Sequence, residues 1–341
     1  MNIIFHIGAG KTGTSSIQGS LRNSDNILVS KGIKYLGLML EHAPVKLYEW
    51  QVPSANHIFQ SLSMDEAQEQ VYEVITQSIL HFDKTGIHTL VWSNEWFWGR
   101  YDVVTNPLKI LEKSGHKVSV VAYVRRHDAW AKSAYSQWGI KHKTYKGGLI
   151  PFNEYVENRP VKFYGVVKQW LEQFGENFII RNFDSANDVV DDFLDAVGID
   201  KEGIVKKRVN ESLGPEEMLV RAIFNNVRAN DVMPVAFDRL FHTIKVDFKR
   251  DPVEWMKSLL PSDDDLEEVE KRSEYDLREI NYILEKRGQE KLSFDIKKYN
   301  REFTINHDIA YSILFQLIER QAVQLQKLRK DFMDLKKSIH E

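Results

Sequence analysis

Residues 2–24 read NIIFHIGAGKTGTSSIQGSLRNS, and this stretch decides the fold. The apolar run at 2–7 predicts a short buried strand, and residues 17–24 predict a helix that follows a glycine-rich turn. Glycines let the backbone approach an anion closely, and the first N–H groups of a helix have no partner within it. Lys11 adds a positive charge to the turn. The stretch therefore predicts a phosphate-binding loop directly after a first strand.

The spacing of this loop differs from that of the P-loop nucleoside triphosphatases. Their motif has a glycine five residues before the glycine of the Gly-Lys-Ser/Thr triplet. Here the triplet is Gly10-Lys11-Thr12, and the position five before Gly10 is Phe5, inside the predicted strand. The loop therefore indicates a different kind of phosphate-binding protein.

A second segment has the character of an anion site. Residues 117–124, KVSVVAYV, predict a strand, which is followed by Arg125 and, eight residues later, by Ser133 on the next predicted helix. Together with the GxxKTGTSS pattern at 8–16, this order resembles the sulfotransferases that use 3′-phosphoadenylyl sulfate (PAPS) as donor. The resemblance is to the bacterial and carbohydrate enzymes and covers roughly residues 1 to 220.

The resemblance implies a donor site with two phosphate-binding parts. Arg125 and Ser133 are expected to hold the 3′-phosphate, and Lys11 is expected to stabilise the leaving 5′-phosphate. The family often has proline where this chain has His127, which alters the helix start but neither ligand. The residues expected to bind the donor at the first loop are Gly10, Lys11, Thr12, Gly13, Thr14, Ser15 and Ser16.

A general base is expected after the strand predicted at 89–92. The segment TLVWSNEWFWGRY, residues 89–101, has Glu95 there. In the family this base is His in the cytosolic small-molecule enzymes and commonly Glu in carbohydrate enzymes, so Glu95 favours a sugar acceptor. A surface or ion-paired role is the alternative for Glu95, and His57 is the alternative base. His6, on the first strand, is predicted to be a packed core residue.

Six further residues are candidates for ligand contacts, each with a structural alternative. Two tryptophans directly after Glu95 suit stacking on a sugar ring or on adenine, and packing inside the protein is the alternative. Two polar residues that follow Ser133 are candidates for contacts with the acceptor. Two basic residues are candidates for contacts with the donor, because relatives often have a basic loop that closes over it. Both of these pairs are also typical of solvated surface side chains. In this order the six are Trp96, Trp98, Gln137, Lys141, Lys207 and Arg208.

Composition narrows the possible functions. The 341 residues carry a net charge of −3, so no global positive field attracts nucleic acid. The chain has no cysteine, which excludes disulfides, thiolate chemistry and cysteine-based metal sites. No dense carboxylate cluster is present, and no metal is expected. No apolar run of about 18 residues predicts a membrane span, and the chain starts directly in a strand, so we expect a cytoplasmic protein.

The order of elements predicts an α/β fold. Apolar runs at 3–7, 89–92, 118–124 and 178–182 alternate with amphipathic stretches, which is typical of a central parallel sheet flanked by helices. The resemblance implies the P-loop NTPase-like fold of sulfotransferases. We expect a PAPS-binding core at 1–215 and a mainly helical C-terminal region at 216–341 that completes the fold. Residues 139–160 are rich in lysine and glycine and predict a mobile loop over the site.

The C-terminal tail has a heptad-like pattern. Leu325, Leu328, Phe332, Leu335 and Ile339 follow one another at alternating steps of three and four residues. Two interpretations stay open for the helix expected at 308–341. Its apolar stripe packs on its own domain, or it pairs with a second copy of the chain in a homodimer.

The sequence therefore predicts transfer of a sulfuryl group from PAPS to a hydroxyl of a carbohydrate, such as a cell-surface polysaccharide or glycolipid. The expected second product is adenosine 3′,5′-bisphosphate (PAP). Three alternatives stay open: a sulfotransferase for a small-molecule or lipid hydroxyl, a nucleotide kinase or other NTPase, and a non-catalytic scaffold of the same fold.

Overall fold

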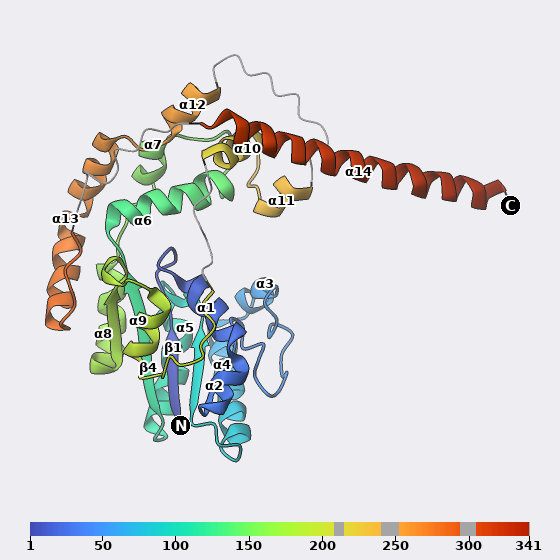
Figure 1. The fold of residues 1–341 in the computed structure, drawn as a ribbon. Coiled ribbons are helices and arrows are strands. Elements are labelled where there is room, and N and C mark those ends of the chain that lie inside the picture. The colour runs from blue at the N-terminus through green and yellow to red at the C-terminus, as the bar shows by residue number, and fades with distance from the viewer. Residues whose placement is uncertain (208–214, 240–251, 294–304, 341) are drawn as a thin grey trace. The chain divides into compact units, whose positions relative to one another are not determined.

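A computed structural model describes residues 1–207, 215–239, 252–293 and 305–340 (Figure 1). The chain forms two compact units. The first comprises residues 1–130, 161–211 and 270–294, and the second comprises residues 131–160, 212–269 and 295–341. The predicted division at residue 215 separates a donor-binding core from a helical region, and it stays a prediction. Each of the two compact units is built from three separate segments, so the chain passes between the units more than once.

The centre of the first unit is a five-stranded sheet with the order β2-β3-β1-β4-β5, in which every pair of neighbours is parallel. This sheet confirms the predicted α/β class. Four strands coincide with the predicted apolar runs, whereas β2 has only three residues, too few to show a pattern. The strands are β1 (Asn2–His6), β2 (Ile33–Tyr35), β3 (Thr89–Ser93), β4 (Lys117–Val124) and β5 (Phe178–Asn182).

Neighbouring side chains of β1 point to opposite faces of the sheet, as the pleat requires. The ring of Phe5 stacks on Trp92 with 4.4 Å between centroids and lies 6.3 Å from Trp170 of α8 (Tyr164–Phe174). The ring of His6 lies 5.3 Å from Phe193 of α9 (Val189–Ala196), on the other face. Both faces are therefore buried beneath helices, which explains why the strands read as continuous apolar runs.

Helices α1, α2 and α9 share one hydrophobic cluster with the sheet, and α5 and α8 pack on β4 and β5 (Figure 1). Helix α4 begins at a capping box, in which Ser63 and Glu66 pair reciprocally. The helices that lie entirely in the first unit are α1 (Thr14–Asn23), α2 (Asp25–Ser30), α3 (Asn56–Gln60), α4 (Met64–Phe82), α5 (Tyr101–Lys113), α8 (Tyr164–Phe174) and α9 (Val189–Ala196).

The second unit is helical in its described part, which confirms the helical character predicted for the C-terminal region. Helices α6 (His127–Ala134) and α13 (Asp263–Lys286) have residues in both units. The others are α7 (Phe152–Glu157), α10 (Pro215–Asn226), α11 (Pro234–Arg239), α12 (Pro252–Leu259), α14 (His307–His340) and the π-helical turn η2 (Tyr135–Lys141).

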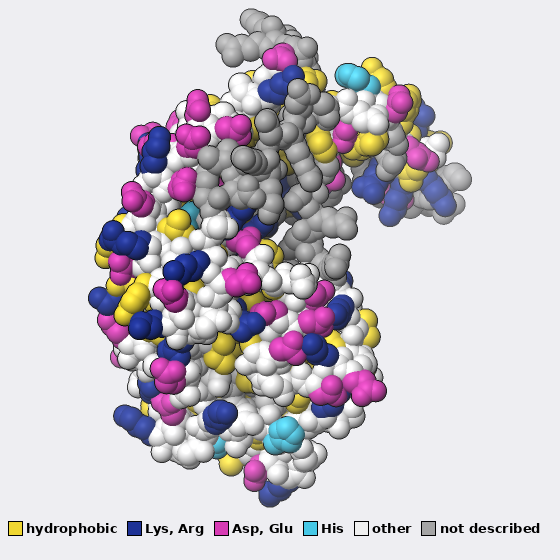
Figure 2. Space-filling model, turned by 60° about the vertical axis from the view of Figure 1, so that its left-hand side comes forward, with side chains coloured by type: hydrophobic (Ala, Val, Ile, Leu, Met, Phe, Trp, Pro, Cys, Tyr) yellow, Lys and Arg dark blue, Asp and Glu magenta, His cyan; other side chains and the backbone are white. Residues whose placement is uncertain are grey.

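The first part of helix α14 packs on its own unit. Leu317 joins a small cluster with Phe224, Val232 and Phe237 of the same unit. From residue 322 to residue 333 every side chain of the helix is exposed. Within the described residues, no helix is long and apolar enough to cross a membrane. Positive and negative side chains are interspersed over the face in Figure 2, in keeping with the small net charge of −3.

Candidate functional site

The sheet has a topological switch point between β1 and β4. The two strands are neighbours, but the chain leaves β1 toward β2 at one edge and leaves β4 toward β5 at the other. In open parallel sheets, ligands bind beyond the carboxyl ends of the strands at such a point. The two predicted anion motifs begin directly after these two strands, so the topology brings their first residues to the same edge of the sheet.

The loop after β1 has a strained backbone. Gly10, Lys11 and Gly13 have φ angles of 60°, 55° and 83°. Among the described residues, only Lys11 and Leu40 adopt positive φ without being glycine. Such conformations cost energy and cluster at binding sites. Gly13 is the N-cap of α1, its carbonyl accepting from Ser16 N at 2.9 Å, so the loop leads directly into the helix N-terminus.

Close packing beneath Gly13 fixes this turn. A Cβ at this position would lie 2.7 Å from Cγ1 of Val189 and 3.0 Å from Cε2 of Phe183. Both the positive φ and the lack of space therefore require glycine. The first amide groups of α1 have no partner within the helix and lie at the positive end of its dipole, which is the usual arrangement for an anion.

Arg125 joins the second motif to the first. Its Nη1 donates a hydrogen bond of 3.2 Å to the carbonyl oxygen of Lys11. Its Nε lies 3.5 Å from Oδ1 of Asp184, and its guanidinium carbon lies 5.0 Å from the centroid of the Phe183 ring. This hydrogen bond joins two cationic residues that lie 114 positions apart in the sequence. The sequence predicted their two motifs separately.

Trp130 is a further tie that the sequence reasoning missed. Its Nε1 donates to the carbonyl oxygens of Gly10 at 3.1 Å and Ala9 at 3.3 Å. These bonds hold the beginning of α6, and with it Arg125, against the loop after β1. The only signal in the sequence was a tryptophan six residues after the end of the strand, and a single residue forms no periodic pattern.

Three polar atoms lie without a partner beneath the loop. They are Oγ1 of Thr12, Oγ1 of Thr14 and Nε2 of His6, all buried and without a hydrogen bond among the described residues. A Cβ on Gly8 would lie 2.4 Å from Oγ1 of Thr14 and 3.3 Å from the other two atoms. The two threonine hydroxyls therefore face the underside of the loop, whereas Ser15 and Ser16 are partly exposed at its rim.

His6 is a core residue, as predicted. Its side chain is fully buried, and Nδ1 lies 2.8 Å from Oγ of Ser93. Burial lowers the pKa of His6 to about 3, because the interior disfavours its charged form. The imidazole is therefore neutral near pH 7.

Glu95 follows β3 at the same edge of the sheet. It opens the short 3₁₀ helix η1 (Glu95–Phe97), which is capped by Asn94, whose Oδ1 accepts from Trp96 N at 3.0 Å. Gln18 of α1 donates to Oε2 of Glu95 at 2.9 Å. The base predicted from the sequence thus lies against the helix that starts at the phosphate loop. Its catalytic role stays a prediction.

The candidate stacking residues both have protein neighbours. The guanidinium of Arg100 lies 4.3 Å from the ring centroid of Trp96, and Trp98 lies 6.2 Å from the ring of Phe163. Both tryptophans are partly exposed, so each retains surface for a ligand. His57, the alternative base, is exposed on α3.

The remaining candidates lie elsewhere on the chain. The backbone N–H of Lys207 donates to Oγ of Ser20 at 2.8 Å, which places this residue beside α1 with its side chain exposed. Arg208 lies outside the described residues. Ser133, Gln137 and Lys141 belong to the second unit and are partly exposed. The roles of all five stay predictions.

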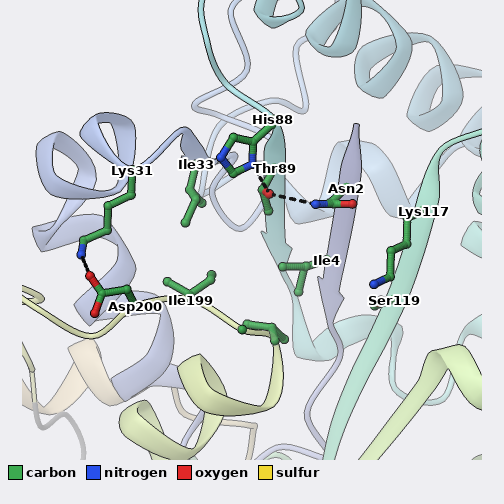
Figure 3. A pocket seen from close by; sticks show the side chains of 12 residues that line it. Asn2, Ile4, Lys31, Ile33, His88, Thr89, Lys117, Ser119, Ile199 and Asp200 are labelled. Atoms are coloured by element: carbon green, nitrogen blue, oxygen red, sulfur yellow. Dashed lines mark hydrogen bonds and ion pairs between the residues drawn. The ribbon is translucent and has the colours of Figure 1, made fainter.

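A pocket of about 300 Å³ lies at the opposite edge of the sheet (Figure 3). Asn2, Thr89 and Lys117 line it, and they begin β1, β3 and β4. Lys31 and Asp200 close one side as an ion pair, which lowers the pKa of Asp200. The amino ends of strands are not where α/β sheets bind ligands, so this pocket is separate from the predicted anion site. No group of three possible metal-binding side chains occurs in the described chain.

The solved structures that align with this chain are distant from it in sequence and in backbone. Two crystal structures of retinol dehydratase, one in complex with androsterone and the inactive cofactor PAP and one with retinol and PAP, align with TM-scores of 0.36 and 0.35. They are 14% and 16% identical in sequence, and the alignments cover 81% of this chain and 80% and 81% of theirs. A structure of the PezAT toxin–antitoxin system of Streptococcus pneumoniae aligns with a TM-score of 0.26 at 10% identity, over 66% of this chain and 84% of its own.

No protein-family profile and no curated protein sequence matches the chain.

Proposed function

We propose that this chain is a sulfotransferase that moves the sulfuryl group of PAPS to an acceptor hydroxyl. The hydrogen bond of 3.2 Å from Arg125 to the carbonyl of Lys11 carries the proposal. It joins two cationic motifs at the switch point of a parallel sheet. A donor with phosphates at the 5′ and 3′ positions of one ribose needs two such groups side by side, one for each phosphate.

Each proposed catalytic residue has one task. Glu95 takes the proton of the acceptor hydroxyl, whose oxygen forms a bond to sulfur while the bond from sulfur to the 5′-phosphate oxygen breaks. The electron pair stays on that phosphate oxygen. Lys11 and the amide groups at the start of α1 stabilise the growing negative charge, and PAP leaves. Arg125, with Ser133, anchors the 3′-phosphate and so aligns donor and acceptor.

We infer that the acceptor is a carbohydrate. A carboxylate base with two partly exposed tryptophans beside it, Trp96 and Trp98, supports a ring with several hydroxyl groups and an apolar face. A small-molecule or lipid hydroxyl is the competing acceptor class. We also propose that the protein is cytoplasmic and that it binds PAPS without a metal ion.

We also propose that two copies of the chain form a homodimer through helix α14. Leu325, Leu328 and Phe332 expose 54%, 56% and 64% of their surface, at the spacing of a coiled-coil seam. Exposed apolar stripes of this kind usually have a partner. In the same heptad frame, Asp331 and Lys336 occupy flanking positions of opposite charge, which favours pairing with a parallel second copy.

Transfer of labelled sulfate from PAPS to a panel of oligosaccharides, sterols and phenols, read by mass, tests the activity and the acceptor class together. Calorimetry with PAP and with Mg-ATP tests the donor site independently. We expect tight binding of PAP and none of Mg-ATP. The reverse preference would establish the NTPase alternative, and binding of PAP without transfer or release of sulfate would establish the scaffold alternative.

A further inference from the structure

The amide group of Gln18 uses both of its hydrogens near the proposed base. Nε2 donates to Oε2 of Glu95 at 2.9 Å and to the carbonyl oxygen of Ser93 at 3.2 Å. An amide nitrogen has two donors and no acceptor, so these two bonds saturate it. Gln18 is partly buried on α1, the helix whose N-cap is Gly13 in the phosphate loop.

Gln18 and Ser93 both belong to regular secondary structure. Ser93 is the last residue of β3, in register with His6 of β1, and its hydroxyl lies 2.8 Å from Nδ1 of His6. Gln18 lies one helical turn beyond Thr14, the first residue of α1. The bond to the Ser93 carbonyl thus fixes where the second hydrogen of Nε2 points, and that hydrogen meets a single oxygen of Glu95.

The two oxygens of Glu95 are not equivalent. Oε2 accepts from Gln18, whereas no hydrogen bond to Oε1 occurs among the described residues. The donor to Oε2 is neutral, so it orients the carboxylate without the charge compensation that a lysine or arginine would bring. Glu95 also acts electrostatically on Tyr35. Burial raises the pKa of this tyrosine most, Glu41 raises it further, Arg22 lowers it, and Glu95 adds a smaller increase.

We infer that Gln18 is a positioning residue that holds Oε2 of Glu95 so that Oε1 receives the proton of the acceptor. This inference rests on the proposed function. In the transfer step the acceptor O–H bond breaks, its proton goes to Oε1, the acceptor oxygen binds sulfur, and the phosphate oxygen keeps the electron pair of the broken bond. Because one helix carries both the phosphate-binding N-terminus and Gln18, donor and base are aligned by the same element.

If Gln18 had a purely structural role, it would only connect α1 to β3 by a hydrogen bond. Its substitution would then lower the stability of the fold without a specific effect on turnover. A positioning role predicts a lower kcat with unchanged binding of PAP, and a pH profile that responds to the charge at position 18. These readouts separate the two roles.

The experiment compares Gln18→Leu and Gln18→Glu with Gln68→Leu in the full chain. Gln68 of α4 is a matched control, because its Nε2 donates to a backbone carbonyl, that of Asp102, at 2.9 Å on the surface. Turnover is followed as release of sulfate from PAPS to water and as transfer to any acceptor found, PAP binding by calorimetry and unfolding by heat. We expect Gln18→Leu to lower kcat about tenfold or more, the typical loss for one hydrogen bond to a charged group, with an unchanged Kd for PAP.

Gln18→Glu brings a second carboxylate next to Glu95. Two such groups cannot both ionise readily, so the rising limb of the rate profile should move to higher pH. If the wild type turns over and Gln18→Leu loses no more activity than Gln68→Leu, the positioning role is wrong while the proposed function stands. If the wild type neither binds PAP nor releases sulfate, the proposed function fails and this inference fails with it.

Discussion

The imidazole of His127 lies 2.7 Å from the carboxylate of Asp276, Nε2 to Oδ2, although the two residues are 149 positions apart. Both are buried, at 3% and 8% exposure. The same carboxylate accepts from the backbone N–H of Phe163 at 2.9 Å and of Tyr164 at 2.8 Å. Asp276 of α13 therefore fixes the start of α8 to the start of α6, two residues after Arg125.

We expect Asp276→Ala to lower the free energy of unfolding by about 3 kcal/mol, because it leaves an imidazole and two amide groups buried without an acceptor. The same change should weaken binding of PAP, since Arg125 loses part of its support. Urea denaturation and calorimetry measure both effects. Glu274→Ala, at an exposed position of the same helix, is the control and should change neither. Equal stability of the two variants would contradict this account.

Local patterns in the sequence predicted the elements and the two anion motifs, because buried strands and phosphate loops have short signatures. They could not predict contacts such as those of Trp130 with Gly10 or Gln18 with Glu95, since no local pattern encodes which side chains meet across a sheet. Residues 139–160 show a second limit. A lysine-rich stretch predicted a mobile loop, yet Lys143 is fully buried.

Lys143 is accommodated because its ammonium group finds acceptors inside the unit. Nζ donates to the carbonyl oxygens of Gly147 and Arg228, and burial lowers its pKa. Tyr135 also donates to the carbonyl oxygen of Ile150 at 2.7 Å, which closes the segment on itself. Charge predicts exposure on average, but backbone carbonyls supplied by distant residues reverse the expectation at a single position.

Lys11→Ala and Glu95→Gln should each reduce turnover by on the order of 10², the typical loss when a charged group or a general base is removed. The two residues have different tasks, so their effects should not depend on the acceptor in the same way. Steady-state rates with PAPS measure both. The partners of an exposed ion pair on α8, changed as Lys168→Ala and Glu172→Gln, are matched controls that should retain wild-type rates. Full activity of Glu95→Gln across pH would exclude Glu95 as the base.

Arg125→Ala should remove the preference for a 3′-phosphate. The guanidinium binds that group by charge-assisted hydrogen bonds, so the affinity for PAP should fall about tenfold or more while the affinity for 5′-AMP stays unchanged. Calorimetry with both nucleotides gives the ratio directly, and the KM for PAPS should rise in parallel. Arg287→Ala, which removes an ion pair with exposed Glu176, controls for the loss of an arginine. An unchanged ratio would show that another residue reads the 3′-phosphate.

His6 should make the protein less stable in mild acid. Burial lowers its pKa from 6.5 to about 3, so below pH 6.5 the unfolded chain binds a proton that the folded chain does not. The effect of His6 on the free energy of unfolding is absent above pH 6.5. Below that pH the free energy of unfolding decreases as the pH falls toward 3, by up to about 1.4 kcal/mol per pH unit. Urea denaturation between pH 7 and 5 should show a flatter slope for His6→Gln than for the wild type. His81→Gln, at an exposed site, should keep the wild-type slope.

The exposed stripe of α14 should hold two copies of the chain together. Leu325 and Leu328 are more than half exposed, and a helix surface of this kind is stable in water when a partner covers it. We expect the wild type to sediment as a dimer and the double variant Leu325→Glu/Leu328→Glu as a monomer, because four buried carboxylates would have to be desolvated in the dimer. Lys327→Glu changes the charge between these positions without entering the seam and should leave the dimer intact. The monomeric variant should still bind PAP, since Lys11 and Arg125 belong to the first unit, whereas the stripe belongs to the second. A wild type that sediments as a monomer at micromolar concentration would rule out this partner for the stripe.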